Sequence, residues 1–103
     1  MATQVFQPLG TVLCGELQGS ATALQLPTIT CRLVKFKALG NNAGNVYLGN
    51  SSSVTVADGT TDTVTGLQLA PGDDSGWLPV SNLNLFYRIC DNAGDDLTYI
   101  ALV

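Results

Sequence analysis

The chain has 103 residues, room for a single domain, with 46% hydrophobic residues, only 12% charged residues and a formal net charge of −4. This acidic balance excludes a protein that binds duplex nucleic acid by neutralising phosphates, and the absence of histidine removes Ser-His-Asp and Cys-His catalysis. No run approaches the ~18 apolar residues of a membrane span and the start lacks a signal-like basic region, so we expect cytoplasmic synthesis and no membrane partner.

Residues 1–10 carry no charge and precede the first predicted strand. Either a disordered tail or an arm laid over a neighbouring chain fits this composition, and the aromatic Phe6 favours the arm. We therefore expect an extended N-terminal arm at 1–10 and one β-domain at 11–103. Val5 and Phe6 are candidate contact residues.

Turn residues punctuate the rest of the chain, and the runs between them are rich in Val, Ile, Leu, Thr and Tyr. This pattern is typical of an all-β sandwich or barrel, and no stretch keeps a helical period for three turns. We expect a single antiparallel β-sandwich, with the jelly roll among its arrangements. The predicted strands lie near 11–17, 22–26, 29–38, 45–49, 53–57, 64–69, 76–80, 84–90 and 97–102.

The apolar residues of the predicted strand 29–38 change from odd to even positions between Leu33 and Val34. Such a shift predicts a β-bulge or a strand that changes sheets. Lys35 and Lys37 then share the solvent face. Because the bases fall in predicted strands and most acids in loops, we expect acidic turns of one subunit to meet these lysines of another.

The last predicted strand, 97–102, is apolar on both faces. Burial on both sides indicates a central strand or a contact with another subunit. Tyr99 and Leu102 are therefore further candidate contact residues.

The sequence Asn-Ala-Gly occurs at 42–44 and again at 92–94, each time between two predicted strands. The residue order fits a hairpin loop with Gly44 and Gly94 in the left-handed conformation. Two structurally related hairpins and the same turn chemistry arising twice both remain open.

The second copy is acidic, with Asp91, Asp95 and Asp96, and such a loop can bind calcium. It lacks the order of ligands of an EF-hand and its distal glutamate. We therefore expect no metal, and solvated carboxylates that keep the turn wet or meet a neighbour's lysines.

Three other features invite a chemical interpretation. Asp73 and Asp74 are paired acids, but an exposed turn offers no desolvation to raise a pKa, so we expect no catalytic residues, no cofactor and no enzyme. Trp77 is either a half-buried core residue, which we favour, or a platform for a sugar. The three cysteines, an odd number, are predicted to be reduced and buried, with a disulfide between Cys14 and Cys31 as the alternative.

Several short motifs follow one another in an order that resembles small virion proteins of tailed bacteriophages. They are Val46-Tyr47-Leu48-Gly49, Gly66-Leu67-Gln68-Leu69-Ala70-Pro71-Gly72, Leu78-Pro79-Val80-Ser81-Asn82-Leu83, Leu85-Phe86-Tyr87 and Leu97-Thr98-Tyr99-Ile100. The resemblance extends over about 33–102. It is to head decoration, or cement, proteins, which sit on the outer capsid lattice, often as trimers, and to related modules of head fibres and tails.

This resemblance implies a structural virion protein on the outer capsid surface, with the major capsid protein and its own copies, as a homotrimer, for partners. The alternative is a glycan- or receptor-binding module of a phage fibre or tail, in which Trp77 stacks on the ligand. The candidate capsid or subunit contacts are Val5, Phe6, Lys35, Lys37, Tyr99 and Leu102.

Overall fold

The computed structural model describes residues 11–57 and 66–103, and in them two four-stranded antiparallel sheets pack against each other. The strands are β1 (Val12–Leu17), β2 (Leu24–Gln25), β3 (Leu33–Ala38), β4 (Val46–Gly49), β5 (Leu67–Leu69), β6 (Asp74–Pro79), β7 (Tyr87–Cys90) and β8 (Leu97–Leu102). One 3-10 turn, η1 (Leu83–Leu85), is the helical element of this part of the chain. The predicted all-β sandwich is confirmed. The predicted arm, with Val5 and Phe6, lies outside the described residues.

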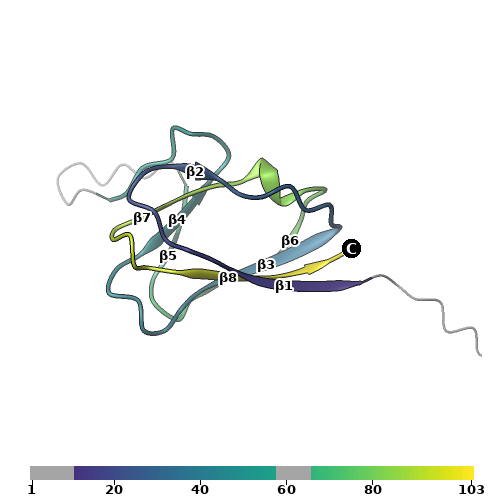
Figure 1. The fold of residues 1–103 in the computed structure, drawn as a ribbon, viewed down its shortest axis with the longest axis horizontal. Helices are drawn as coiled ribbons and strands as arrows, with labels where there is room; N and C mark the ends of the chain where they lie inside the picture. The colour runs from purple at the N-terminus through teal and green to yellow at the C-terminus, as the bar shows by residue number, and fades with distance from the viewer. Residues whose placement is uncertain (1–10, 58–65) are drawn as a thin grey trace, which may run out of the picture.

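The two sheets have the strand order of a jelly roll. Sheet A runs β1-β8-β3-β6 and sheet B runs β2-β7-β4-β5. Each of the first four strands pairs with one of the last four, as β1 with β8, β2 with β7, β3 with β6 and β4 with β5. One long hairpin rolled over on itself produces this nested pairing. Figure 1 shows β1, β3 and β8 running side by side along sheet A.

The core between the sheets follows from the alternation of side chains along β3. Val34, Phe36 and Ala38 point inward and are fully buried, while Lys37 is exposed. The Phe36 ring meets the edge of the Phe86 ring with centroids 5.1 Å apart, which joins sheet A to the segment before β7. Full burial of each large apolar side chain stabilises the fold by roughly 1.5–3 kcal/mol.

The change of parity seen in the sequence falls at the start of β3. The backbone bends at Arg32, after an isolated bridge between Thr30 and Asn82, and β3 begins at Leu33. The predicted strand 29–38 was therefore too long. The predicted strand 53–57 is also wrong, because these residues form a turn and a loop.

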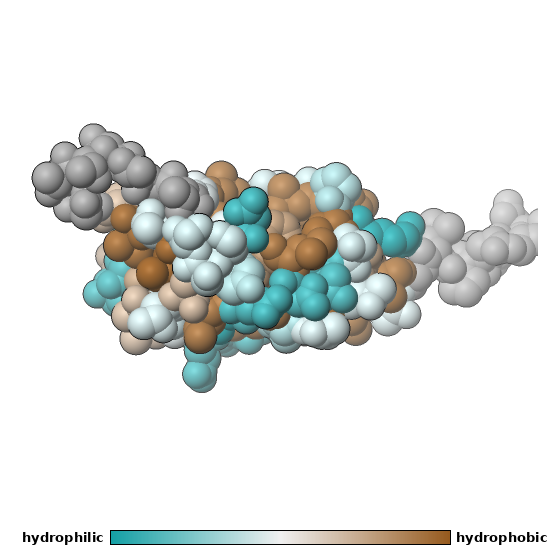
Figure 2. All heavy atoms as spheres, turned by 90° about the horizontal axis from the view of Figure 1, so that it is seen from above, coloured by the Kyte–Doolittle hydropathy of each residue, from teal (hydrophilic) through white to brown (hydrophobic). Residues whose placement is uncertain are grey.

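The surface of the molecule carries both apolar and polar side chains. Figure 2 shows one face of the molecule, on which hydrophobic residues gather in patches beside hydrophilic ones. Among the described residues, Leu24, Leu67 and Leu85 are large and exposed. A composition with few charges thus leaves apolar side chains at the surface.

β6 contains a bulge opposite β3. Lys35 faces Trp77, but Lys37 faces Asp74, so that β6 carries an additional residue between the two pairs. Gly76 lies in the bulge with φ +70°, a left-handed conformation that glycine adopts without strain. The bulge lies in the partner strand and not in the 29–38 run where the sequence suggested one.

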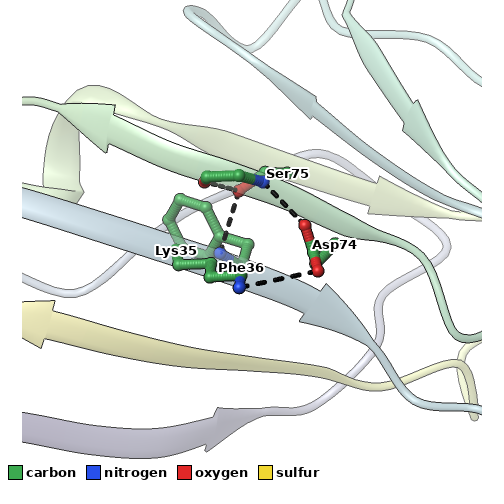
Figure 3. A network of polar contacts seen from close by, with 5 residues as sticks. Lys35, Phe36, Asp74 and Ser75 are labelled. Atoms are coloured by element: carbon green, nitrogen blue, oxygen red, sulfur yellow. Dashed lines mark hydrogen bonds and ion pairs between the residues drawn. The ribbon is translucent and has the colours of Figure 1, made fainter.

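The Ser75 side chain replaces a missing bond of the ladder at this bulge. The backbone N–H of Phe36 donates to Ser75 Oγ at 3.0 Å, and Ser75 Oγ donates to the Gly76 carbonyl at 2.7 Å. The Gly76 N–H donates to Asp74 Oδ1 at 2.9 Å (Figure 3). The bulge therefore keeps its polar groups bonded through side chains.

Replacing Ser75 with Ala is expected to lower the free energy of unfolding by about 1–3 kcal/mol, because the Phe36 N–H loses its acceptor. Urea unfolding followed by tryptophan fluorescence measures the change. The exposed Ser52→Ala is the matched control and should stay within about 0.5 kcal/mol of the parent chain. Equal stability of the two variants would show that water replaces the Ser75 hydroxyl without cost.

Candidate interaction face

The side of sheet A that points away from sheet B carries side chains from all four strands, and we call it the outer face. The strand register arranges them in three rows across the sheet. The first row holds Val12, Leu102, Leu33 and Pro79, the second holds Cys14, Ile100, Lys35 and Trp77, and the third holds Glu16, Thr98, Lys37 and Asp74. The outer face therefore grades from apolar at one end to charged at the other.

Two large apolar side chains of the outer face are well exposed. Val12 on the edge strand β1 is 55% exposed, and Trp77 on β6 is 47% exposed. Leu33, Ile100 and Leu102 lie between them and are half-buried by their neighbours in the sheet. Contiguous exposed apolar surface of this kind is typical of a site of protein contact.

Lys35 links the apolar and charged parts of the outer face. Its Nζ lies 3.6 Å from Asp74 Oδ2 and 5.9 Å from the centroid of the Trp77 ring. Figure 3 shows Lys35 and Asp74 reaching toward each other from adjacent strands. An exposed pair of this kind contributes at most about 1 kcal/mol to stability. A partner can therefore bind either charge, and loss of the ion pair would lower the stability of the fold only slightly.

The structure brings together three of the predicted contact residues and separates one. Lys35, Lys37 and Leu102 lie on the outer face with Trp77. Tyr99 faces the other way and packs against the core. It lies over Gly15, where an added Cβ would come within 2.7 Å of the tyrosine oxygen.

Val12, Leu33 and Ile100 were not predicted as contact residues, although alternation in β1 would have pointed to Val12. Trp77 is half-exposed, but on the outer face and not between the sheets. β8 lies between β1 and β3, so its predicted central position is confirmed. Its outer side is partly shielded by lateral neighbours rather than by a further layer among the described residues.

The two Asn-Ala-Gly turns lie next to each other and connect the two sheets. Residues 39–45 lead from β3 in sheet A to β4 in sheet B, and residues 91–96 lead back from β7 to β8. The two predicted hairpins are therefore wrong, since each turn crosses between sheets. Neither glycine is left-handed, because the described glycines with positive φ are Gly72 and Gly76. Gly44 is needed for space, since an added Cβ would lie 2.7 Å from Asp91 Cβ.

Asp95 holds these two turns together. It is 1% exposed, and its Oδ1 accepts hydrogen bonds from the backbone N–H groups of Ala43 at 2.9 Å and Gly44 at 3.2 Å. Its Oδ2 accepts from the backbone and side-chain nitrogens of Asn92, both at 3.0 Å. Desolvation raises the pKa of Asp95, but these hydrogen bonds outweigh it and hold the pKa below the ordinary 3.8. The prediction of a solvated Asp95 was wrong.

Asp96 extends this network to the β1–β2 connection. Its Oδ1 accepts from the Gly19 N–H at 3.0 Å, and its backbone exchanges two hydrogen bonds with the Asn42 side chain. Glu16 lies beside it, and a side-chain hydrogen bond to Asp96, the negative charge of Asp96 and partial desolvation raise the pKa of Glu16 above 4.5. Asp96 is half-buried and binds backbone, so the prediction of a solvated carboxylate is wrong for its Oδ1, while a contact with a neighbour's lysines stays a prediction.

Asp91 completes the set of acids in the second turn. Its Oδ2 accepts from the Asn45 N–H at 2.8 Å, and its Oδ1 accepts from the Tyr47 hydroxyl at 3.2 Å. We call Asp91, Asp95 and Asp96 with their partners the clasp. Within the described residues, no group of three or more His, Cys, Asp or Glu is placed to hold a metal ion.

The three cysteines are free thiols. Cys31 and Cys90 are buried, and desolvation raises the pKa of each. Cys14 is exposed on the outer face, so its predicted burial was wrong, and it forms no disulfide with Cys31.

An apolar pocket of about 490 Å³ opens between the edges of the two sheets at β5 and β6. Its lining residues are Leu48, Gly49, Asn50, Gly66, Leu67, Leu78, Val80, Leu85 and Phe86. The sequence contained no signal for it, because its walls come from four separate parts of the chain.

Comparison with known proteins found no family model, no curated protein and no solved structure that matches this chain. No helix among residues 11–57 and 66–103 has the length and apolar character needed to cross a membrane. We therefore infer function from the outer face of sheet A and from the contacts of its residues.

Proposed function

We propose that this chain is a structural protein that attaches to a larger protein surface through the outer face of sheet A. The observation that carries the proposal is the outer face itself, where exposed Val12 and Trp77 share one side of sheet A with the charged Lys37 and Asp74. Protein interfaces likewise combine apolar and aromatic surface with charged groups.

The surface we propose is the outer side of a phage capsid, formed by the major capsid protein. The motif order from Val46 to Ile100 supports this proposal, since it resembles capsid decoration proteins. Jelly rolls occur in viral and lectin domains, but the fold alone does not determine function. A small face of modest affinity suits a lattice, because linked contacts of a homotrimer multiply their affinities.

A second candidate is a glycan-binding module of a fibre or tail. The exposed Trp77 and the Asp74 carboxylate, each in contact with Lys35, favour it, because a sugar stacks on an aromatic ring and donates hydrogen bonds to a carboxylate. However, the Lys35 ammonium lies over the Trp77 ring, 5.9 Å from its centroid, in the space that a stacked sugar would need. We therefore place this candidate second.

The double variant Lys35→Glu with Lys37→Glu is expected to weaken binding to capsids at least tenfold, because it reverses the charge of the outer face. Stability should change by no more than about 1 kcal/mol, since the ion pair is exposed. Co-sedimentation with undecorated capsids, assembled from the major capsid protein of the same genome, measures the binding. The control is Gln68→Glu, which adds a negative charge on exposed β5 of sheet B. If the double variant binds capsids as tightly as the wild type, the outer face does not form the contact.

A further inference from the structure

β1 is the most open edge of the two sheets. The edge strands are β1 and β6 in sheet A and β2 and β5 in sheet B. β2 has two residues, β5 has three, and β6 is interrupted by the bulge at Gly76 and ends in Pro79. β1 has six residues in unbroken register with β8. Proteins blunt sheet edges with short strands, bulges and proline, and these devices protect every edge except β1.

The free side of β1 presents hydrogen-bonding groups of the backbone. Thr11 and Val103 exchange both of their backbone hydrogen bonds, at 3.3 and 2.8 Å. Bonded and non-bonded pairs alternate along an antiparallel ladder, so Val12, Cys14 and Glu16 direct their N–H and C=O groups away from β8. Three donors and three acceptors therefore point toward the open side of sheet A.

The side chains of β1 are apolar on both faces of the strand. Val12 on the outer face is 55% exposed and Leu13 on the other face is 38% exposed, while Cys14 is also exposed. Glu16 is the single charge of the strand, and lysine and proline are absent from it. A regular, largely apolar edge with a single charge near its end is the kind that pairs with another strand.

We propose that β1 pairs with β1 of a second copy of this chain, antiparallel and across a two-fold axis at Leu13. This register places Val12 opposite the partner's Cys14, which makes an apolar cluster on the outer face. The two Glu16 side chains then stay six residues, or roughly 20 Å, apart along the paired strands. A register centred on Cys14 would instead place Glu16 against Val12, which favours the Leu13 centre.

The pairing produces one eight-stranded sheet in which the outer faces of both copies lie on the same side. The first row of each copy then continues into the second row of the other, and Val12 and Cys14 of both copies lie at the centre of a continuous surface. This contact has two-fold symmetry, so it is distinct from a trimer contact. It stands independently of the proposed attachment to a capsid.

Cysteine cross-linking tests the register directly. In the variant Leu13→Cys with Cys14→Ser, the two introduced thiols lie in a non-hydrogen-bonded pair with Cα atoms roughly 4.5 Å apart, within the range of a disulfide. With excess copper(II)-phenanthroline as oxidant, two copper(II) ions accept one electron each as two thiols lose their protons and form the disulfide, and we expect a covalent dimer of twice 10.7 kDa on non-reducing gels. The matched control is Glu16→Cys with Cys14→Ser, whose thiols are too far apart to link. We expect at least tenfold more dimer from the first variant.

Equal cross-linking of the two variants would overturn the pairing, and efficient cross-linking of the wild type through Cys14 would overturn the register. A second measurement uses Val12→Lys, which adds like charges near the axis at an exposed position that the core does not need. Sedimentation equilibrium should show association of the wild type with rising concentration and its loss in this variant. Equal association of the wild type and of Val12→Lys would also overturn the pairing.

Discussion

Replacing Asp95 with Ala is expected to lower the free energy of unfolding by about 3–5 kcal/mol, a large part of the 5–15 kcal/mol that holds a typical domain together. The change removes the acceptor of three backbone N–H groups, those of Ala43, Gly44 and Asn92, and of the Asn92 side-chain amide. Asp95 is almost fully buried, and donors that point at a buried position cost free energy when their acceptor is removed.

Chemical unfolding monitored by circular dichroism measures this loss. The matched control is Asp73→Ala, at an exposed turn where the carboxylate accepts from the Ala70 N–H, and it should cost less than about 1 kcal/mol. A similar cost at both positions would contradict the clasp.

The same carboxylate gives the clasp a dependence on pH. The folded-state pKa of Asp95 lies below 3.8, so its contribution is fully present above the unfolded value and is lost as the pH falls through the folded value. The stability difference between the wild type and Asp95→Asn should therefore shrink as the pH is lowered from about 5 to about 2. A constant difference over this range would contradict the assignment.

Replacing Trp77 with Ala is expected to weaken capsid binding by about 2 kcal/mol or more, roughly thirtyfold, because exposed tryptophans dominate contact energies. Trp77 contributes the largest exposed apolar surface of the outer face and lies beside the charged pair of Lys35 and Asp74. Isothermal titration or co-sedimentation with capsids measures the change.

The fold should tolerate Trp77→Ala, since half of the side chain is already exposed. Leu24→Ala is the control, because Leu24 is exposed to a similar degree on sheet B, and it should bind like the wild type. An equal loss in the two variants would indicate a general effect on the fold, and no loss in Trp77→Ala would exclude the tryptophan from the contact.

Local patterns predicted the strands but not their connections. The alternation in β3 and the two apolar faces of β8 indicated which residues are buried and that β8 is central. The Asn-Ala-Gly turns looked like hairpins because a hairpin is the local solution for two neighbouring strands. In a jelly roll these turns cross between sheets, and that depends on strand pairs far apart in sequence.

The site could be predicted only in part for the same reason. The parity of the 29–38 run placed Lys35 and Lys37 on a solvent face, and the structure places them on the outer face. Val12 was missed because its row exists only once β1 is known to lie beside β8. The burial of Asp95 was missed because its partners Ala43 and Gly44 lie about fifty residues away.

Electron cryomicroscopy of capsids mixed with the purified chain tests the central claim most directly, namely that the outer face attaches this protein to a capsid lattice. We predict regular added density at the three-fold or quasi-three-fold positions, with sheet A toward the capsid and Trp77 in the contact, and empty positions with Trp77→Ala. Capsids that stay bare with the wild-type chain, together with a glycan-array signal that Trp77→Ala abolishes, would contradict the account and support the glycan-binding module.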